Sequence, residues 1–366
     1  MSPKIALCLP GGGAMGALFQ VGALAAIEDA VEGFDANSFD LYVGSSVGAS
    51  LSATLAAGLP VQRLYRAFLD PADVYFGLER KHLLRIDLGE WRRTLLSALS
   101  AIGRAAGSAL SREPKEVPAS LWQELDRLYD SLPAGLFTLE GYEKFLDEFF
   151  VRRGVPKVFA AVPKPLRVLS HDLDTGAAVC FGGEGFEGVP LARACIASMA
   201  VPPFFSPVRI GDRQYINPGA GLLSPLEVAA REGATVIVVV NSMVPVSVAS
   251  VPTGHGHRDS LRDKGMMWVM NQALRIGTQR LLDDTCTRLA AQPGLSLLRI
   301  EPTPEDGVLF LYNAASFEAR RQLLEHAYTS TRHELGRRFA ESDPALLRAG
   351  FRAKVPANRP SAPPPP

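Results

Sequence analysis

Asp40-Leu-Tyr-Val-Gly-Ser-Ser-Val-Gly-Ala-Ser50 is the stretch around which the chain is organised. A short apolar run, Leu41 to Val43, leads into Gly44-Ser-Ser-Val-Gly48, which matches the pattern G-x-S-x-G. In that pattern a strand turns sharply into a helix and presents the central serine, here Ser46, on strained backbone. Glycine is needed on both sides because a Cβ would crowd the turn. The helix that follows points its partial positive charge at the serine. The pattern therefore predicts Ser46 as a nucleophile.

A strand, a glycine loop and a helix precede this elbow. Lys4 to Leu9 is a short, largely apolar run, typical of a strand covered on both faces. Pro10-Gly-Gly-Gly-Ala-Met-Gly16 follows, and Ala17 to Ala30 has the length and alanine content of a buried helix. A second helix is predicted directly after the elbow, from Val47 to Ala57. This alternation indicates a parallel sheet wrapped by helices.

The later part of the chain continues the alternation. Strands are predicted at 165–170, 177–181, 208–210, 214–216, 234–240 and 295–300, and helices at 191–199, 225–232, 261–291 and 316–339. The strands at 208–210 and 214–216 should pair as a hairpin that turns at Gly211-Asp212. In the helix at 261–291, one apolar stripe has 3-4-3-4 spacing and is expected to dock on the core, with a dimer seam or a lipid contact as the alternatives. Its members are Met267, Met270, Leu274, Gly277 and Leu281.

Residues 62–150 differ from the rest because helical patterns and polar loops dominate them. Within this region Arg80 to Lys115 carries eight basic and three acidic residues. One interpretation is a basic amphipathic lid that rests on anionic lipid headgroups. The interpretation that we favour is a solvated helical insertion whose apolar side docks on the main domain.

Composition limits the classes of function. The 366 residues can bury a large core, and 38 basic against 38 acidic residues give no reason to expect a nucleic-acid partner. The four cysteines are far apart and show no metal-ligand spacing, so we expect no metal site. The start of the chain lacks the features of a signal peptide, and no run of apolar residues is long enough to span a bilayer. We expect a cytoplasmic protein that can still contact membranes peripherally.

The glycine loop does not fit the common nucleotide-binding motifs. A dinucleotide fingerprint needs an acidic residue at the end of the second strand, where this chain has Val43 and Gly44. A P-loop needs Lys and Ser or Thr after the glycines, which Met15-Gly16 does not supply. An ordinary α/β-hydrolase is also excluded, because only 45 residues precede Ser46.

An oxyanion hole made from backbone fits the loop better. The loop offers amide N–H groups at a helix N-terminus, and it follows the strand next to the elbow. These groups belong to Gly11, Gly12, Gly13 and Ala14. Such donors stabilise the negative charge that builds on a carbonyl oxygen under attack by a serine. The two motifs together predict acyl transfer.

At this point the sequence resembles the patatin-like phospholipases. The shared blocks are Gly11 to Gly16, Gly44 to Gly48, Leu191 to Pro207, and the hairpin with the glycine-rich loop at 217–219. They occur in family order and spacing over about residues 4 to 240. The resemblance implies a three-layer α/β/α fold with a mostly parallel central sheet. It also implies a Ser-Asp dyad that cleaves acyl esters of lipids or phospholipids without a histidine or a cofactor.

The resemblance further suggests how the chain is divided. We expect an acyl hydrolase domain at 1–240, with the helical insertion at about 62–150 inside it. Residues 241–350 should form a C-terminal helical extension that completes the domain. Residues 351–366, which are rich in proline, should be a disordered tail.

The chain departs from the family at the catalytic base. The family's third block begins Asp-Gly-Gly or Asp-Gly-Ala, whereas Asn217-Pro218-Gly219 stands here. An amide cannot accept the serine proton at neutral pH. Asp172, Asp174, Asp212 and His171 are the nearest replacements in the family layout. Two hypotheses follow: a lipid acyl hydrolase with an impaired or relocated base, and a weak or inactive member that binds lipid or protein.

Overall fold

The computed structural model describes most of the chain. The described residues are 3–77, 82, 85–86, 88–89, 91–92, 94–96, 99–100, 132–220, 224–247, 260–303, 306–311 and 316–354. Most of the basic segment at 80–115 and the tail from 355 onward lie outside the described residues.

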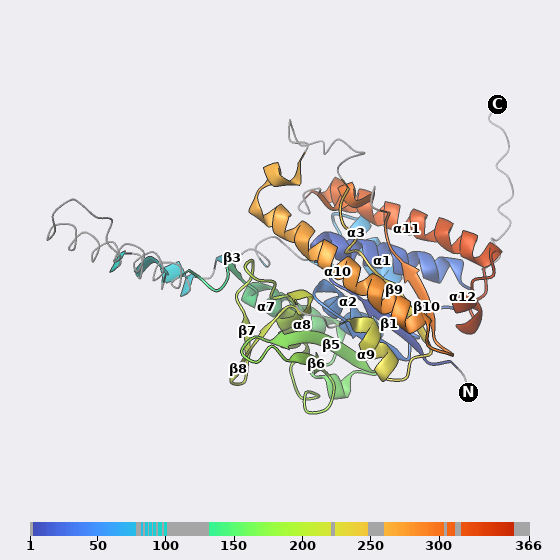
Figure 1. The fold of residues 1–366 in the computed structure, drawn as a ribbon, viewed down its shortest axis with the longest axis horizontal. Coiled ribbons are helices and arrows are strands. Elements are labelled where there is room, and N and C mark those ends of the chain that lie inside the picture. The colour runs from blue at the N-terminus through green and yellow to red at the C-terminus, as the bar shows by residue number, and fades with distance from the viewer. Residues whose placement is uncertain are drawn as a thin grey trace.

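A single sheet forms the centre of the fold (Figure 1), in the order β10-β9-β1-β2-β5-β8-β7, with β6 paired to β5. Its strands are β1 (Ile5–Leu9), β2 (Leu41–Gly44), β5 (Leu166–Asp172), β6 (Ala178–Phe181), β7 (Val208–Ile210), β8 (Arg213–Ile216), β9 (Val236–Val240) and β10 (Ser296–Ile300). The pairs from β10 to β5 are parallel, and β6, β7 and β8 pair antiparallel. The mostly parallel sheet predicted from the sequence is confirmed.

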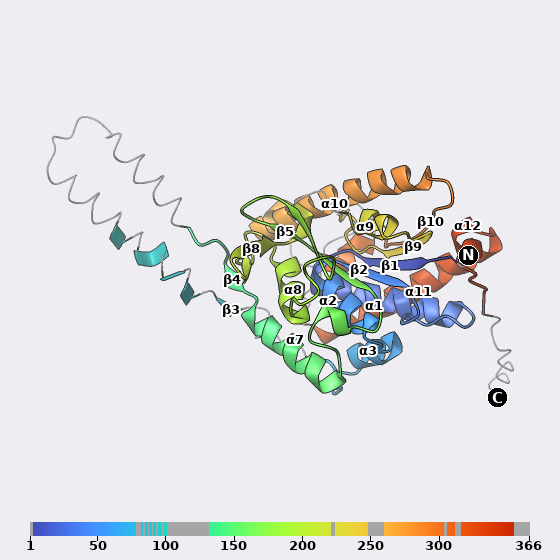
Figure 2. The same ribbon diagram turned by 90° about the horizontal axis from the view of Figure 1, so that it is seen from below.

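Helices cover both faces of this sheet, so the fold is three-layer α/β/α. They are α1 (Gly13–Ala30), α2 (Val47–Ala56), α3 (Val61–Leu69), α7 (Glu140–Arg153), α8 (Leu191–Met199), α9 (Pro225–Arg231), α10 (Met266–Ala290), α11 (Phe317–Ala340) and α12 (Pro344–Arg348). Figure 2 shows α9 and α10 on one side of the sheet and α1, α2 and α3 on the other. Short 3-10 turns are η1 (Phe159–Ala161), η2 (Pro218–Ala220), η3 (Leu261–Lys264) and η4 (Asp306–Leu311).

The alternation of side chains along β1 explains why its sequence is apolar without interruption. Leu7 and Leu9 belong to the core on the α1 side, whereas Ala6 and Cys8 belong to the core on the α9 and α10 side. Successive side chains of a strand point to opposite faces, so a sheet covered twice needs apolar residues at every position. None of the helices in the described ranges is long and apolar enough to cross a bilayer.

Two helices within 62–150 belong to the main core. Leu64 of α3 and Phe145, Leu146 and Phe149 of α7 are all buried in the same cluster as α1 and α8. The small antiparallel pair β3 (Arg85–Ile86) and β4 (Phe137–Thr138) lies between these helices in the chain. These two helices flank the segment at 80–115. Most of that segment, whose apolar side was expected to dock on the main domain, lies outside the described residues.

Two expectations about the C-terminal half are wrong. The buried residues of α10 are Arg275, Leu282, Thr285 and Leu289, whereas Met267 and Met270 of the predicted stripe are each 37% exposed. The stripe therefore does not dock on the core. The tail was expected to begin at residue 351, which is too early. Phe351 packs edge-on against Phe34, and the N–H of Lys354 donates to the carbonyl of Ala30.

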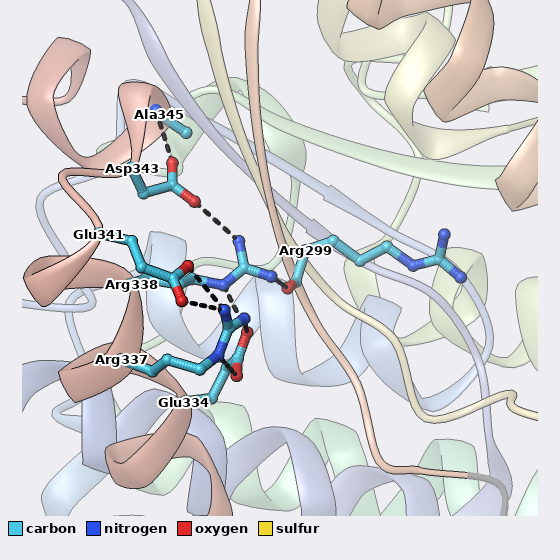
Figure 3. A network of polar contacts seen from close by, with 7 residues as sticks. All are labelled: Arg299, Glu334, Arg337, Arg338, Glu341, Asp343 and Ala345. Atoms are coloured by element: carbon cyan, nitrogen blue, oxygen red, sulfur yellow. Dashed lines mark hydrogen bonds and ion pairs between the residues drawn. The ribbon is translucent and has the colours of Figure 1, made fainter.

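The C-terminal helices are fixed to the edge of the sheet by a group of arginines (Figure 3). Arg338 donates to the backbone carbonyl of Arg299 in β10 at 2.9 Å and pairs with Glu334 and Asp343. Asp343 also caps α12 by accepting from the N–H of Ala345. Arg337 and Arg338 hydrogen-bond to Glu334 and lower its pKa to about 2. This network joins α11, α12 and β10 in one unit.

Gly22 gives a test of the packing of α11 on α1. A Cβ at Gly22 would lie 2.6 Å from the backbone oxygen of Leu324 and 2.9 Å from the Cβ of Ala327, so Gly22→Ala must push the helices apart. We expect the free energy of unfolding in urea to fall by about 1–3 kcal/mol. Gly336→Ala in α11 is the control, because its Cβ would meet nothing within 4 Å. It should raise stability by about 0.5–1 kcal/mol. Equal effects of the two changes would contradict this packing.

Candidate active site

Ser46 lies at a sharp turn between β2 and α2. Its φ of 55° and ψ of −131° are strained for a residue with a side chain, and it is the N-cap of α2. Both flanking glycines are required. A Cβ at Gly44 would lie 2.5 Å from the oxygen of Gly48, and a Cβ at Gly48 would lie 2.1 Å from the oxygen of Leu9. The turn is therefore possible only with these glycines.

The glycine loop lies directly against Ser46. A Cβ built on Gly11 would lie 2.9 Å from the Cβ of Ser46 and 3.4 Å from its Oγ. Gly12 and Gly13 have φ values of 151° and 65°, and α1 begins at Gly13. The first turn of a helix leaves its N–H groups without acceptors inside the helix, which applies here to Gly13 and Ala14. The structure thus brings the loop and the serine together.

Ser242, which no sequence motif marks, packs against the glycine loop and hydrogen-bonds to it. Its Oγ donates to the carbonyl oxygen of Gly11 at 3.0 Å. Cβ atoms at Gly12 and Gly16 would come within 2.1 Å and 2.5 Å of this Oγ, so the glycines also make room for Ser242. Gln20, which is fully buried, donates from Nε2 to the carbonyl of Pro10 at the start of the loop.

Arg275 of α10 in turn holds Ser242. Its guanidinium donates to the carbonyl oxygens of Ser242 at 3.0 Å and Val244 at 2.8 Å, and it stacks over the ring of Phe310. The side chain is buried, and burial lowers its pKa to about 10. It therefore stays charged at neutral pH, bound to carbonyl dipoles. No sequence signal indicates this role, because a lone arginine in a long helix is normally exposed.

Ser198, at the end of α8, connects the elbow with Asn217. Its Oγ accepts a hydrogen bond from the backbone N–H of Ser46 at 2.8 Å. Its carbonyl oxygen accepts from Nδ2 of Asn217. The Oδ1 of Asn217 accepts from the N–H of Gly219 at 2.8 Å, and the backbone N–H of Asn217 donates to Ala200. Ser46 and Asn217 thus belong to one hydrogen-bonded network.

These contacts fit an amide at position 217 and do not fit a carboxylate. The NH₂ group is the donor that the carbonyl of Ser198 requires, and the amide oxygen is the acceptor that Gly219 requires. Two oxygens would face each other if Asn217 were ionised Asp. Within the described ranges, no carboxylate or imidazole hydrogen-bonds to the Oγ of Ser46.

The other candidate bases are engaged elsewhere or face solvent. Asp172 pairs with Arg213 at 2.6 Å and accepts from the N–H groups of Asp174 and Thr175. The hydrogen bond from Arg213 lowers the pKa of Asp172, which holds it as an ionised structural group. Asp212 and Asp174 are exposed. The Nδ1 of His171 lies 3.3 Å from the carbonyl oxygen of Ala177.

A pocket of about 420 Å³ lies beside α8, between the start of α7 and the β7–β8 hairpin. Ile196, two residues before Ser198, lines it together with Glu140 and Arg193. Its volume is within the range of small-molecule sites. Among the described residues there is no group of three His, Cys, Asp or Glu that could hold a metal ion.

The tie between Asn217 and Ser198 can be tested through stability. Asn217→Asp should lower the free energy of unfolding at pH 7 by about 1–3 kcal/mol, because a buried acceptor loses its donor. The pKa of the new carboxyl should be higher in the folded than in the unfolded chain, where it is about 3.9. The loss of stability is then largest at pH values above the pKa of this carboxyl in the folded chain. It shrinks as the pH falls toward the pKa in the unfolded chain.

Urea unfolding of this variant and of the wild type at pH 7 and pH 4.5 measures the effect. Asn217→Ala is the matched control, since its loss of stability has no titrating group and should be equal at the two pH values. An Asn217→Asp loss that does not depend on pH would contradict the orientation of the amide.

The sequence matches the model of a known protein family. A sequence model described as patatin-like phospholipase matches residues 7–230, more than half of the chain. No curated protein sequence matches the chain.

Among solved structures, the chain resembles VipD from Legionella pneumophila, at 16% identity and a TM-score of 0.39, with 92% of this chain and 67% of VipD covered. It also resembles ExoU from Pseudomonas aeruginosa in complex with SpcU, at 15% identity and a TM-score of 0.38, with 92% and 53% covered. A third is human GIVD cytosolic phospholipase A2 in complex with methyl gamma-linolenyl fluorophosphonate, at 13% and 0.32, with 95% and 59% covered. The chain spans only a little over half of the last two.

Proposed function

The chain belongs to the patatin-like phospholipase family, and on that premise we propose that it is a serine-dependent hydrolase of lipid acyl esters. The observation that carries this proposal is the contact between Ser46, on its strained turn, and the backbone of Gly11. Acyl transfer requires a nucleophile and, close to it, amide donors for the developing negative charge. Here both would stand at helix N-termini.

In the proposed reaction the Oγ of Ser46 attacks the carbonyl carbon of the ester and forms an acyl-enzyme. The amides of Gly11, Gly12, Gly13 and Ala14 act as the oxyanion hole, where each donor is typically worth about 10²–10³ in rate. The alcohol leaves with a proton, and water then releases the fatty acid. This chemistry needs neither a metal nor a cofactor.

The proton of Ser46 must leave without the help of a side-chain base at position 217. General-base assistance is typically worth about 10²–10⁴ in rate, and Asn217 cannot provide it. Serine hydrolases that lose a member of the triad retain part of their activity through the oxyanion hole and substrate binding. We therefore propose slow hydrolysis, with Asn217 acting as a positioning residue through Ser198.

The second candidate function is a binding module for lipid or protein that hydrolyses nothing. The contacts of Asn217 favour it, because its Nδ2 donates to the carbonyl oxygen of Ser198 and its Oδ1 accepts from Gly219, so that neither atom serves as a base for Ser46. The elbow and the glycine loop would then be retained because they support the fold.

The proposed function also suggests boundaries and location. We propose that residues 1–240 form the hydrolase domain and that residues 241–350 complete it. The hydrogen bond of Ser242 to Gly11 and that of Arg275 to Ser242 support this. We further propose a cytoplasmic protein that contacts membranes peripherally, since its substrate would be a phospholipid or another lipid ester.

An alkyl fluorophosphonate probe tests the nucleophile. Attack by Ser46 on phosphorus expels fluoride and leaves a covalent adduct, which is read by intact-protein mass spectrometry. We expect labelling of the wild type and its loss in Ser46→Ala. Ser45→Ala is the matched control and should label normally, because Ser45 is buried beside the elbow. A wild-type protein that does not label would refute the proposed hydrolase.

The double change Asn217→Asp with Pro218→Gly tests the missing base. If the site is otherwise competent, hydrolysis of a soluble short-chain ester should rise by about 10²–10⁴. The second substitution gives the loop the freedom that a carboxylate needs to turn away from the carbonyl of Ser198. Asn217→Ala with Pro218→Gly is the control and should give no gain. Fast hydrolysis by the wild type that the double change does not increase would show that another group already acts as base.

A further inference from the structure

The N-terminal half of α10 has its polar side facing the protein. Gln272 accepts from the N–H of Val246 and donates to its carbonyl oxygen, both at 3.0 Å. Gln279 accepts from the side-chain amide of Asn241, and Arg275 binds the carbonyls of Ser242 and Val244. These side chains hold the segment at 241–246, which follows β9, by hydrogen bonds.

The opposite side of the same half is apolar and exposed. Met266, Val269, Met270 and Ile276 are 67%, 49%, 37% and 49% exposed. Their spacing of three, one and six residues puts them on one side of the helix, together with Ala273 and Gly277. We call these six residues the outer α10 face. No charged residue interrupts it before Arg280, and Figure 2 shows α10 along the outside of the molecule.

This arrangement is the reverse of an ordinary surface helix, which buries its apolar stripe and exposes its polar one. The C-terminal half of α10 is ordinary, because Leu282 and Leu289 are buried and Asp283 and Asp284 are exposed. The inversion is therefore confined to the first half. The outward direction of this apolar side, and not its size, makes it a candidate contact site.

The half of α10 that carries this face lies near the carboxyl ends of the parallel strands, where the site also lies. The segment at 241–246 leaves the carboxyl end of β9, and its Ser242 bonds to Gly11 beside Ser46. α10 also packs against η2, the turn that follows Asn217. Figure 1 shows the beginning of α10 at the end of the sheet away from the N-terminus.

Basic residues bracket the face. Arg262 and Lys264 precede it in η3, and Arg280 follows it, with Asp263 as the acidic residue among them. Cations around an apolar face complement anionic lipid headgroups. Unbranched methionines adapt to an irregular surface such as lipid chains.

The area of the face argues against a second copy of the chain as its partner. Twelve residues of helix are about 18 Å long, and a helix with its side chains is about 10–12 Å wide. One side is therefore on the order of 200 Å², far below the roughly 800 Å² per partner of a stable interface. A lipid surface requires no such minimum, since binding grows with each side chain that enters it.

We propose that the outer α10 face docks on the surface of a lipid bilayer, with Arg262, Lys264 and Arg280 at the headgroups. The choice of lipid as partner rests on the proposed function. Docking there would hold the edge of the sheet that carries Ser46 at the membrane, where a lipid ester substrate resides.

Vesicle co-sedimentation of the full chain carrying Ser46→Ala tests this docking without hydrolysis of the vesicles. We expect binding to phosphatidylcholine vesicles that contain phosphatidylglycerol. Val269→Ser with Ile276→Ser should weaken it by about tenfold or more, because both substitutions remove apolar surface that would enter the bilayer. Arg262→Gln with Lys264→Gln should weaken binding only to the vesicles that contain phosphatidylglycerol. Leu347→Ser is the matched control, because Leu347 is 64% exposed on α12 and should not affect binding.

Two further measurements separate this proposal from the proposed function. With Ser46 restored, the Val269→Ser and Ile276→Ser variant should hydrolyse a soluble ester as the wild type does, whether that rate is high or zero. Sedimentation velocity tests for a second copy. Absence of vesicle binding, equal binding by all variants, or a dimer that these substitutions dissociate would each overturn lipid docking. Binding without any hydrolysis would leave docking intact and refute only the hydrolase.

Discussion

The close approach of the start of α2 to the end of β1 is the constraint on which the site depends. A Cβ at Gly48 would lie 2.1 Å from the oxygen of Leu9, so no side chain can stand between the two segments. This approach brings the turn at Ser46 beside the loop that continues from β1. The positive φ of Ser46 and the glycines on both sides are consequences of the same requirement. The sheet fixes the two strands, and the glycines let their ends meet.

The C-terminal half of the chain maintains this contact from the other side. Ser242 fills the space that Gly12 and Gly16 leave, and Arg275 binds the backbone of Ser242. A charged group is costly to bury, and here the cost is offset by two carbonyl dipoles and the ring of Phe310. The glycine loop is thus supported by residues more than 200 positions away in the sequence. The helix that supplies Arg275 also presents an apolar face to the outside, so one element connects the site with a surface.

The side chain of Asn217 is held in place through both ends of its amide. Its amide connects the end of α8 with the turn at Gly219, and Ser198 passes the connection on to the backbone of Ser46. Those contacts need one donor and one acceptor, which an amide has and a carboxylate lacks. The network therefore stabilises the elbow while it leaves the Oγ of Ser46 without a base among the described residues. Under the proposed function, hydrolysis would depend mainly on the backbone amides of the glycine loop.

The sequence by itself determined the parallel sheet, the strands and helices that form it, and the turn at Ser46. These features follow from local rules, since apolar runs, helix periodicity and the glycines of a tight turn are read over a few residues. The same rules failed for the direction in which α10 faces, because a stripe of methionines looks alike whether it meets a core or the outside. They gave no sign of Ser242 or Arg275, nor of the contacts that Ser198 makes, because the partners of these residues are brought to them only by the crossing of distant segments. The tertiary structure decided these contacts, and with them the donor and acceptor that make an amide fit at position 217.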